Sequence, residues 1–183
     1  KVLRDKYSIT KNIIDYFCDA GVCVRERQII FRNPVKDREM AQNKHNLNEE
    51  QKLVVDEISK DYEEGIRKNY LIHGVTGSGK TEVYMNIIEE VLKKGKEVIV
   101  LVPEISLTPQ LVNIFRSRFK SSIAILHSAL SDGEKYDEWR KIERKEVKIV
   151  IGARSAIFAP FTNIGLIVLD EEHSETYKQD NNP

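Results

Sequence analysis

A glycine-rich run near the middle of the chain holds the residue types that bind phosphate groups. Residues 74–81 read Gly-Val-Thr-Gly-Ser-Gly-Lys-Thr and match the pattern G-x-x-x-x-G-K-[ST]. In this pattern backbone N–H groups close around phosphates, Lys80 adds a positive charge at the β- and γ-phosphates, and the Thr81 hydroxyl is a ligand for Mg²⁺. The residues expected to contact the nucleotide are Gly74, Thr76, Gly77, Ser78, Gly79, Lys80 and Thr81. The alternative is a glycine-rich turn that binds nothing, although a chance match to the pattern is rare.

Two acidic residues after an apolar run supply the second half of a candidate catalytic site. Asp170 and Glu171 directly follow the apolar residues 166–169. If that run is a strand of the same sheet, Asp170 is placed to hold Mg²⁺ through its water shell. Glu171 is then placed to orient and deprotonate an attacking water. An ordinary polar turn after a buried strand is the alternative, and the phosphate loop makes it the weaker interpretation.

The phosphate loop alone does not separate kinases, GTPases, transporters and motors. A GTPase needs an N-K-x-D base-recognition element after these motifs, and the only Asn-Lys pair, Asn43-Lys44, precedes them and lacks the Asp. The sequence therefore favours ATP over GTP. A kinase or transferase needs an acceptor pocket and a lid, and no segment of the sequence indicates either.

Alternating strands and helices must position these residues. Asn48 and Gln51 form a capping box for a helix that runs to about Gly65. The apolar run 70–73 predicts a strand before the phosphate loop, and 81–94 predicts the helix after it. Further predicted strands cover 98–102, 123–126, 147–151 and 166–169, the first covered on both faces and the last two buried, with helices starting at Thr108-Pro109 and Ser131. This alternation predicts an open parallel α/β sheet with its sites at the carboxyl ends of the strands.

The first part of the chain differs from the rest in charge and pattern. Residues 1–45 carry ten basic and six acidic side chains, whereas the whole chain has 29 of each. A helix over 8–21 and alternation over 22–32 fit the last helix and wing of a winged-helix domain, and a small α/β appendage fits equally well. With a linker over 34–46, we expect a winged-helix-like segment in residues 1–46 and an ATP-binding lobe in residues 47–183.

Overall composition excludes several classes of protein. A formal net charge of zero rules out binding of polyanions through bulk charge alone. No apolar run reaches the length needed to cross a bilayer and no targeting segment is present, so we expect a cytoplasmic protein with no membrane partner. Cys18 and Cys23 suggest neither a disulfide framework nor a four-ligand zinc site, and we expect them to be buried or half-buried. Because the chain begins without Met, we expect it to be a piece of a longer protein.

Taken together, the motifs resemble those of the superfamily-two helicases, and specifically of the primosomal replication-restart helicases. The segments that carry this resemblance are Leu47-Asn-Glu-Glu-Gln, GVTGSGKT, LVPEISLTPQ (101–110), Leu126-His-Ser, GARSAIF (152–158) and DEEH (170–173). The resemblance implies a RecA-like first motor lobe that ends after the DEEH motif. It also implies an ATP-dependent 3′-to-5′ DNA helicase or translocase that acts in replication restart and primosome assembly.

The resemblance assigns further roles to individual residues. Gln51 takes the place of the glutamine that reads adenine, although a capping box alone explains a Gln there. Arg154 and Ser155, with Thr108 and Gln110, are expected to contact single-stranded DNA, but Thr108 is also a helix cap and Arg154 fits a surface salt bridge. His173 is expected to link the nucleotide site to the DNA side.

The resemblance also implies partners and cofactors. The expected partners are single-stranded and forked DNA, primosome proteins and single-strand-binding proteins. ATP and Mg²⁺ are the expected cofactors, whereas the family's zinc-binding region lies outside this sequence. Two other classes stay open: another superfamily-two translocase acting on RNA or duplex DNA, and, less favoured, a non-motor P-loop kinase or transferase. A lobe that only binds DNA is favoured solely if nucleotide does not bind.

Overall fold

The structure is a computed structural model, and it describes residues 7–24, 46–120 and 122–178. Contacts divide the chain into two units, residues 1–31 and 32–183. In the first unit the predicted helix is confirmed as α2 (Lys11–Asp19), which ends before Gly21 in the left-handed conformation. Cys18 is half-buried as expected, but the prediction is wrong for Cys23, which is exposed because it lies beyond the helix end. The predicted wing and linker fall almost entirely on residues outside the described ranges.

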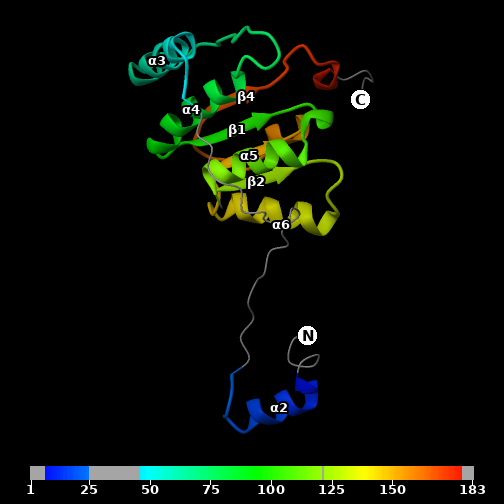
Figure 1. Cartoon of the computed structure of the whole chain (residues 1–183). Helices are drawn as coiled ribbons and strands as arrows, with labels where there is room; N and C mark the ends of the chain where they lie inside the picture. Colours follow the sequence, from blue (N-terminus) through cyan, green and yellow to red (C-terminus); the bar gives the residue numbers. More distant parts are fainter. Residues whose placement is uncertain (1–6, 25–45, 121, 179–183) are drawn as a thin grey trace. The chain divides into compact units, whose positions relative to one another are not determined.

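The second unit contains a four-stranded parallel sheet (Figure 1). Its strands are β1 (Glu97–Leu101), β2 (Ile123–Leu126), β3 (Ile149–Gly152) and β4 (Ile164–Leu169), in the spatial order β2-β3-β1-β4. All three pairings are parallel, with Leu101 opposite Gly152 on one side and Leu169 on the other. The predicted open parallel α/β sheet is confirmed.

Helices cover both faces of the sheet, as the unbroken apolar strands require. On one face, Val98 and Val100 pack against α4 (Lys80–Lys93) and α5 (Pro109–Phe119), with Phe115 fully buried at the centre. On the other face, Ile99 and Leu101 pack with Ile142 of α6 (Asp132–Glu143) and with the short helix η2 (Arg154–Phe158). Alternate residues of one strand thus fill two separate cores.

Local capping chemistry starts the helices where the sequence predicted. The side chains of Asn48 and Gln51 form the capping box of α3 (Glu49–Glu63), and Ser131 forms one with Glu134 at α6. Thr108 caps α5 by accepting a hydrogen bond from the Leu111 amide at 3.3 Å. These caps set the positions of the loops that precede each helix.

Two of the predicted elements differ in the structure. Residues 70–73 form no strand, and Leu71 is 75% exposed. The predicted burial of β4 is also wrong, because Ile167 and Leu169 remain about half exposed. Among the described residues β4 pairs with β1 alone and is the edge of the sheet. An apolar run becomes a buried strand only where a neighbouring strand and a covering layer meet it, and local sequence does not encode that.

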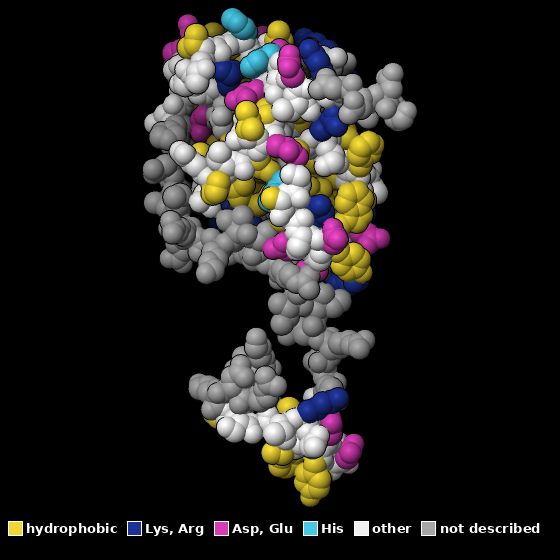
Figure 2. Space-filling model, turned by 90° about the vertical axis from the view of Figure 1, so that its right-hand side faces the viewer, with side chains coloured by type: hydrophobic (Ala, Val, Ile, Leu, Met, Phe, Trp, Pro, Cys, Tyr) yellow, Lys and Arg dark blue, Asp and Glu magenta, His cyan; other side chains and the backbone are white. Residues whose placement is uncertain are grey.

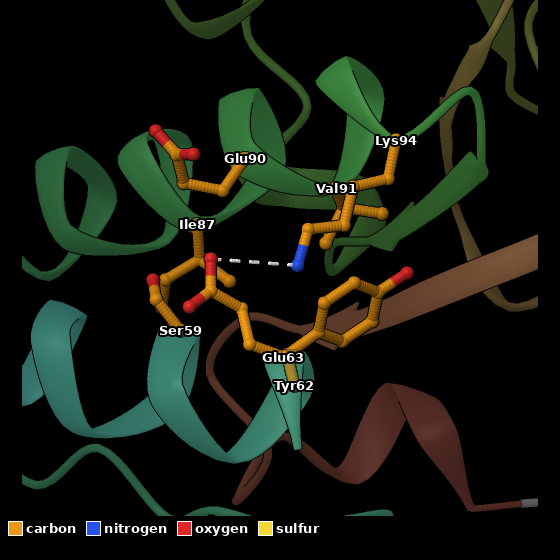
Figure 3. Close-up of a pocket in the computed structure, with 7 residues that line it drawn as sticks. All are labelled: Ser59, Tyr62, Glu63, Ile87, Glu90, Val91 and Lys94. Carbon is orange, nitrogen blue, oxygen red and sulfur yellow. Dashed lines mark ion pairs between the residues drawn. The ribbon is translucent and has the colours of Figure 1, made fainter. Parts of the chain in front are cut away.

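Helix α3 packs on α4, which begins at the phosphate loop. Val55 and Ile58 of α3 meet Val83 and Ile87 of α4 in a third apolar cluster. A small pocket at the far end of this contact is lined by both helices and spanned by an ion pair between Lys94 and Glu63 at 3.7 Å (Figure 3). This packing fixes α3, and therefore Gln51, relative to the phosphate loop. Within the described ranges no helix is long and apolar enough to span a membrane.

A buried carboxylate on α6 generates a testable prediction about stability. Glu138 is 2% exposed, accepts a hydrogen bond from the Ile125 amide of β2 at 2.9 Å, and pairs with Lys141. Glu138→Ala leaves that amide without a partner and should lower the free energy of unfolding by about 2 kcal/mol, measured by urea denaturation. Glu138→Gln keeps an acceptor oxygen and should lose less.

Glu143→Ala, on an exposed position of the same helix, is the matched control and should change the unfolding free energy by less than about 0.5 kcal/mol. Equal losses in Glu138→Ala and Glu143→Ala would contradict this account of the Ile125 contact.

Candidate active site

The phosphate loop leads directly into α4. Gly77 and Gly79 both have φ of +81°, a backbone conformation that side chains other than glycine rarely adopt. Gly79 is the N-cap of α4, so the first N–H groups of the helix open toward the loop. The predicted loop-to-helix junction is confirmed, although the segment before it is not a strand.

Lys80 lies across this loop. Its ammonium group donates hydrogen bonds to the carbonyl of Gly74 at 2.7 Å and to that of Val75 at 3.0 Å. The side chain is half-buried, and two of its three donors are thus held by the backbone. The positive charge is fixed within the loop rather than extended into solvent.

Gln51 joins α3 to the phosphate loop through both ends of its amide. Its Oε1 accepts from the Asn48 amide at 2.9 Å, which completes the capping box, and its Nε2 donates to the Ser78 carbonyl at 2.8 Å. Nε2 also lies so close to Gly79 that a Cβ at that position would meet it at 2.5 Å. The cap is therefore present, and the same side chain also braces the loop. Whether it reads adenine stays a prediction.

Asp170 and Glu171 follow β4 at the end of the sheet where β1 also ends. The Asp170 amide donates to the Leu101 carbonyl at 2.9 Å, which continues the β1–β4 ladder by one residue. Asp170 is half-buried and Glu171 is exposed. As predicted, both carboxylates emerge at the carboxyl edge of the sheet. Figure 2, viewed from the side toward which the strands point in Figure 1, shows apolar, acidic and basic side chains intermingled there.

Tyr84 connects Asp170 to the start of α4. Its hydroxyl donates to Asp170 Oδ2 at 3.0 Å. Burial, and next the negative charge of Asp170, raise the pKa of Tyr84 far above its usual range, while a hydrogen bond with Thr81 acts in the opposite direction. The phenol therefore stays protonated and donating. Thr81 and Asp170, the two residues expected to hold Mg²⁺, both lie against this hydroxyl.

Tyr177 holds the other side of the same turn. Its hydroxyl donates to the Asp170 carbonyl at 2.7 Å, and burial followed by the Asp170 charge raises its pKa. Arg154 in turn donates to the Lys178 carbonyl at 2.9 Å. The backbone after β4 is thus fastened to α4 by Tyr84 and to η2 by Arg154.

The residues expected to contact DNA lie at the starts of two helices, Thr108 and Gln110 at α5 and Arg154 and Ser155 at η2. Gln110 and Ser155 are exposed, Arg154 is exposed and bound to the Lys178 carbonyl, and Thr108 acts as a cap. His173 is exposed on the turn after Glu171. Their roles in DNA contact and coupling stay predictions.

Sequence reasoning missed Tyr84 and Ser106. Tyr84 follows Thr81 by three residues, so the helical period places both side chains on one face of α4. That spacing was the available signal for Tyr84. Ser106 donates to Glu171 Oε2 at 3.2 Å, and this contact depends on the pairing of β1 with β4. No local sequence pattern predicts the contact of Ser106 with Glu171.

The donor set at this edge fits a magnesium–nucleotide complex. Mg²⁺ is usually held by one or two carboxylates or hydroxyls together with phosphate oxygens and water. Thr81 and Asp170 supply such groups, and no cluster of three or more His, Cys, Asp or Glu side chains suited to a metal occurs among the residues with described positions. The site thus has the oxygen donors of a shared metal site rather than those of an all-protein cage.

Comparison with known proteins agrees with this geometry. Residues 48–181 match the family model described as "DEAD/DEAH box helicase". The chain is 54% identical over 164 residues to "Replication restart protein PriA" of Bacillus subtilis (strain 168), covering 89% of this chain and 20% of that protein. Proteins of the same name from Synechocystis sp. and Haemophilus influenzae are 61% and 46% identical over 60% and 84% of this chain, and over 13% and 20% of their own lengths.

The chain therefore spans a fifth or less of the length of these relatives. The resemblance to replication-restart helicases that the motifs indicated is confirmed by these matches. Because the family model covers most of the sequence, the chain belongs to the DEAD/DEAH box helicase family.

Proposed function

We propose that this chain is the ATP-binding lobe of a DNA helicase that acts in replication restart. One observation carries the proposal: Tyr84 brings Thr81 of the phosphate loop and Asp170 of the acidic pair to one hydroxyl. The loop expected to bind phosphate and the acidic pair expected to act in hydrolysis therefore lie at the same edge of the sheet. The names of the relatives support the biological setting.

Different residues of the lobe bind the phosphates, would hold Mg²⁺ and accept the proton. Lys80 and the backbone N–H groups of residues 74–81 bind the phosphates of ATP, and Gln51 braces the loop from outside. Mg²⁺, when bound with ATP, neutralises charge that develops on the phosphates. Asp170 and Thr81 are the residues that would hold it. Glu171, exposed beside them, takes the proton of the attacking water.

The DNA-related assignments extend this proposal. Arg154, Ser155 and Gln110 present side chains at the edge of the sheet where hydrolysis takes place, which supports contact with a single strand. Movement in the 3′-to-5′ direction, action on forked DNA, contacts with primosome and single-strand-binding proteins and a role for His173 in coupling rest on the family resemblance. A helicase of the bacterial chromosome works in the cytoplasm, and we place this one there.

The first prediction from this function concerns nucleotide binding. Lys80→Ala removes the charge held inside the loop and should abolish binding of Mg-ATP and Mg-ADP, as measured by isothermal titration calorimetry. Lys93→Ala, at an exposed position near the other end of α4, is the matched control and should bind like the wild type. Unchanged affinity in Lys80→Ala would contradict the assignment of the loop.

The second prediction separates the two carboxylates in the full-length protein. Glu171→Gln keeps the shape of the side chain but loses its basicity, so nucleotide binding should persist while turnover falls by about 10² to 10⁴. Asp170→Asn should in addition raise the Mg²⁺ concentration needed for activity. Steady-state ATPase assays at varied Mg²⁺ measure both effects, with Glu143→Gln as a remote control. Wild-type turnover in Glu171→Gln would refute the role of this residue.

The third prediction concerns the lobe by itself. An arginine finger contributes about 10³ to 10⁵ in rate to phosphoryl transfer, and the guanidinium of Arg154 is already bound to the Lys178 carbonyl. The 183-residue chain should therefore bind ATP, hydrolyse it slowly and unwind no fork. ATPase and fork-unwinding assays beside the full-length protein test this. Comparable DNA-stimulated turnover would show that a finger is supplied within the lobe or by a second copy of it.

A further inference from the structure

The carboxylate of Glu171 is held by a residue outside the acidic motif. Ser106 Oγ donates a hydrogen bond to Glu171 Oε2 at 3.2 Å, across 65 positions of sequence. Within the described part of the chain this is the one hydrogen bond that the carboxylate makes, although the side chain is exposed. The base of the proposed reaction is therefore tethered to a neighbouring loop.

Sheet topology explains why these two residues meet. Strands β1 and β4 are parallel neighbours, with Leu101 opposite Leu169, so the loops that follow them leave the sheet side by side. The loop after β1 turns at once into the short helix η1 (Glu104–Ser106), which the Pro103 carbonyl closes by accepting from the Ser106 amide at 2.9 Å. This turn places the Ser106 hydroxyl over the residue that follows Asp170.

The backbone of Glu171 is in a disfavoured conformation. Its φ is +49°, in the left-handed region that few residues other than glycine adopt. The turn is closed by a hydrogen bond from the Ser174 amide to the Glu171 carbonyl at 2.8 Å. A strained backbone at a functional residue persists only when its surroundings hold it there, and such residues cluster at switch regions. The Glu171 amide also donates to Asp170 Oδ1 at 3.1 Å, and among the described residues Ser106 is the one whose side chain binds the Glu171 carboxylate.

The turn that carries Ser106 is open to solvent. Ile105 is 82% exposed and Glu104 is exposed, whereas Ser106 is half-buried beneath them. The same segment continues into Thr108, the N-cap of α5, and into Gln110 in its first turn, which the proposed function assigns to the DNA strand. A strand lying on this loop therefore presses on the segment that positions the Ser106 hydroxyl.

We propose that Ser106 is a positioning residue that restrains Glu171 until a DNA strand occupies the segment 104–110 between β1 and the first turn of α5. In the free lobe the hydroxyl holds the carboxylate toward the β1 loop. Strand binding moves the loop, breaks this hydrogen bond and frees Glu171 to accept the proton of the attacking water. The inference rests on the proposed function, because it assigns the DNA dependence of ATP hydrolysis to one contact at that site.

Ser106→Ala in the full-length protein tests the restraint. ATPase activity is measured without DNA and with saturating oligo(dT), and strand affinity is measured by fluorescence anisotropy of a labelled oligo(dT). Loss of one hydrogen bond to a charged group should raise kcat without DNA about tenfold. The rate at saturating DNA, the KM for ATP and the strand affinity should stay unchanged, so the ratio of stimulated to basal rate falls.

Three further variants make the result specific. Ser106→Thr keeps the hydroxyl and should restore a low basal rate. Ser106→Cys keeps the size but offers only a weak donor, so it should also raise the basal rate, and the result does not depend on the alanine variant folding. Ser117→Ala is the matched control, because this hydroxyl bonds only the Ile114 carbonyl within α5.

Two outcomes would overturn the inference. An unchanged basal rate with weaker oligo(dT) binding would make Ser106 a DNA contact only. Equal losses of basal and stimulated rates would mean that Ser106 holds Glu171 in its productive position. Glu171→Gln, assayed in parallel, distinguishes failure of the proposed function from failure of the restraint. Normal turnover in Glu171→Gln rejects the proposed function itself. Loss of turnover in Glu171→Gln together with an unchanged basal rate in Ser106→Ala rejects only the restraint.

Discussion

The parallel pairing of β1 with β4 is the constraint on which the rest of the site depends. It runs to the end of both strands, and the Asp170 amide extends it by bonding the Leu101 carbonyl at 2.9 Å. This bond fixes Asp170 to β1, a strand in which every residue is buried. Asp170 lies in a surface turn but is therefore held by the core of the protein. The loops that follow β1 and β4 must therefore lie side by side, and side chains of one loop can contact those of the other.

Around that fixed point two tyrosines do the positioning. The phenol of Tyr84 reaches the Asp170 carboxylate from α4, and the phenol of Tyr177 reaches its carbonyl from η3 (Glu175–Tyr177). Both groups have raised pKa values because of burial and the Asp170 charge, so both are donors at physiological pH. Tyr84 thus holds the carboxylate of Asp170, and Tyr177 holds the backbone of the same residue.

Much of this architecture is readable from sequence because it depends on local chemistry. The capping boxes of Asn48 and Ser131 predict the starts of their helices, and the unbroken apolar run of β1 predicts a strand covered on both faces. Features that depend on neighbours are not readable. The run 70–73 has strand composition but no partner among the described residues, β4 is an edge that only the pairing order reveals, and the contact of Ser106 with Glu171 exists only after the strands have been ordered. Local rules predict elements, whereas register and adjacency decide which side chains meet.

The contact between Gln51 and the phosphate loop gives a second reason for a glycine at position 79. Gly79 is usually explained by its left-handed backbone and by the space that a phosphate needs, but here a Cβ would also collide with Nε2 of Gln51 at 2.5 Å. Replacing the glycine would push the amide away from the Ser78 carbonyl and from the Asn48 amide together, and the capping box of α3 would lose one of its two hydrogen bonds. A substitution at Gly79 would thus act on α3 as well as on the phosphate loop, through the contact of Gln51 with Ser78 across 27 positions of sequence.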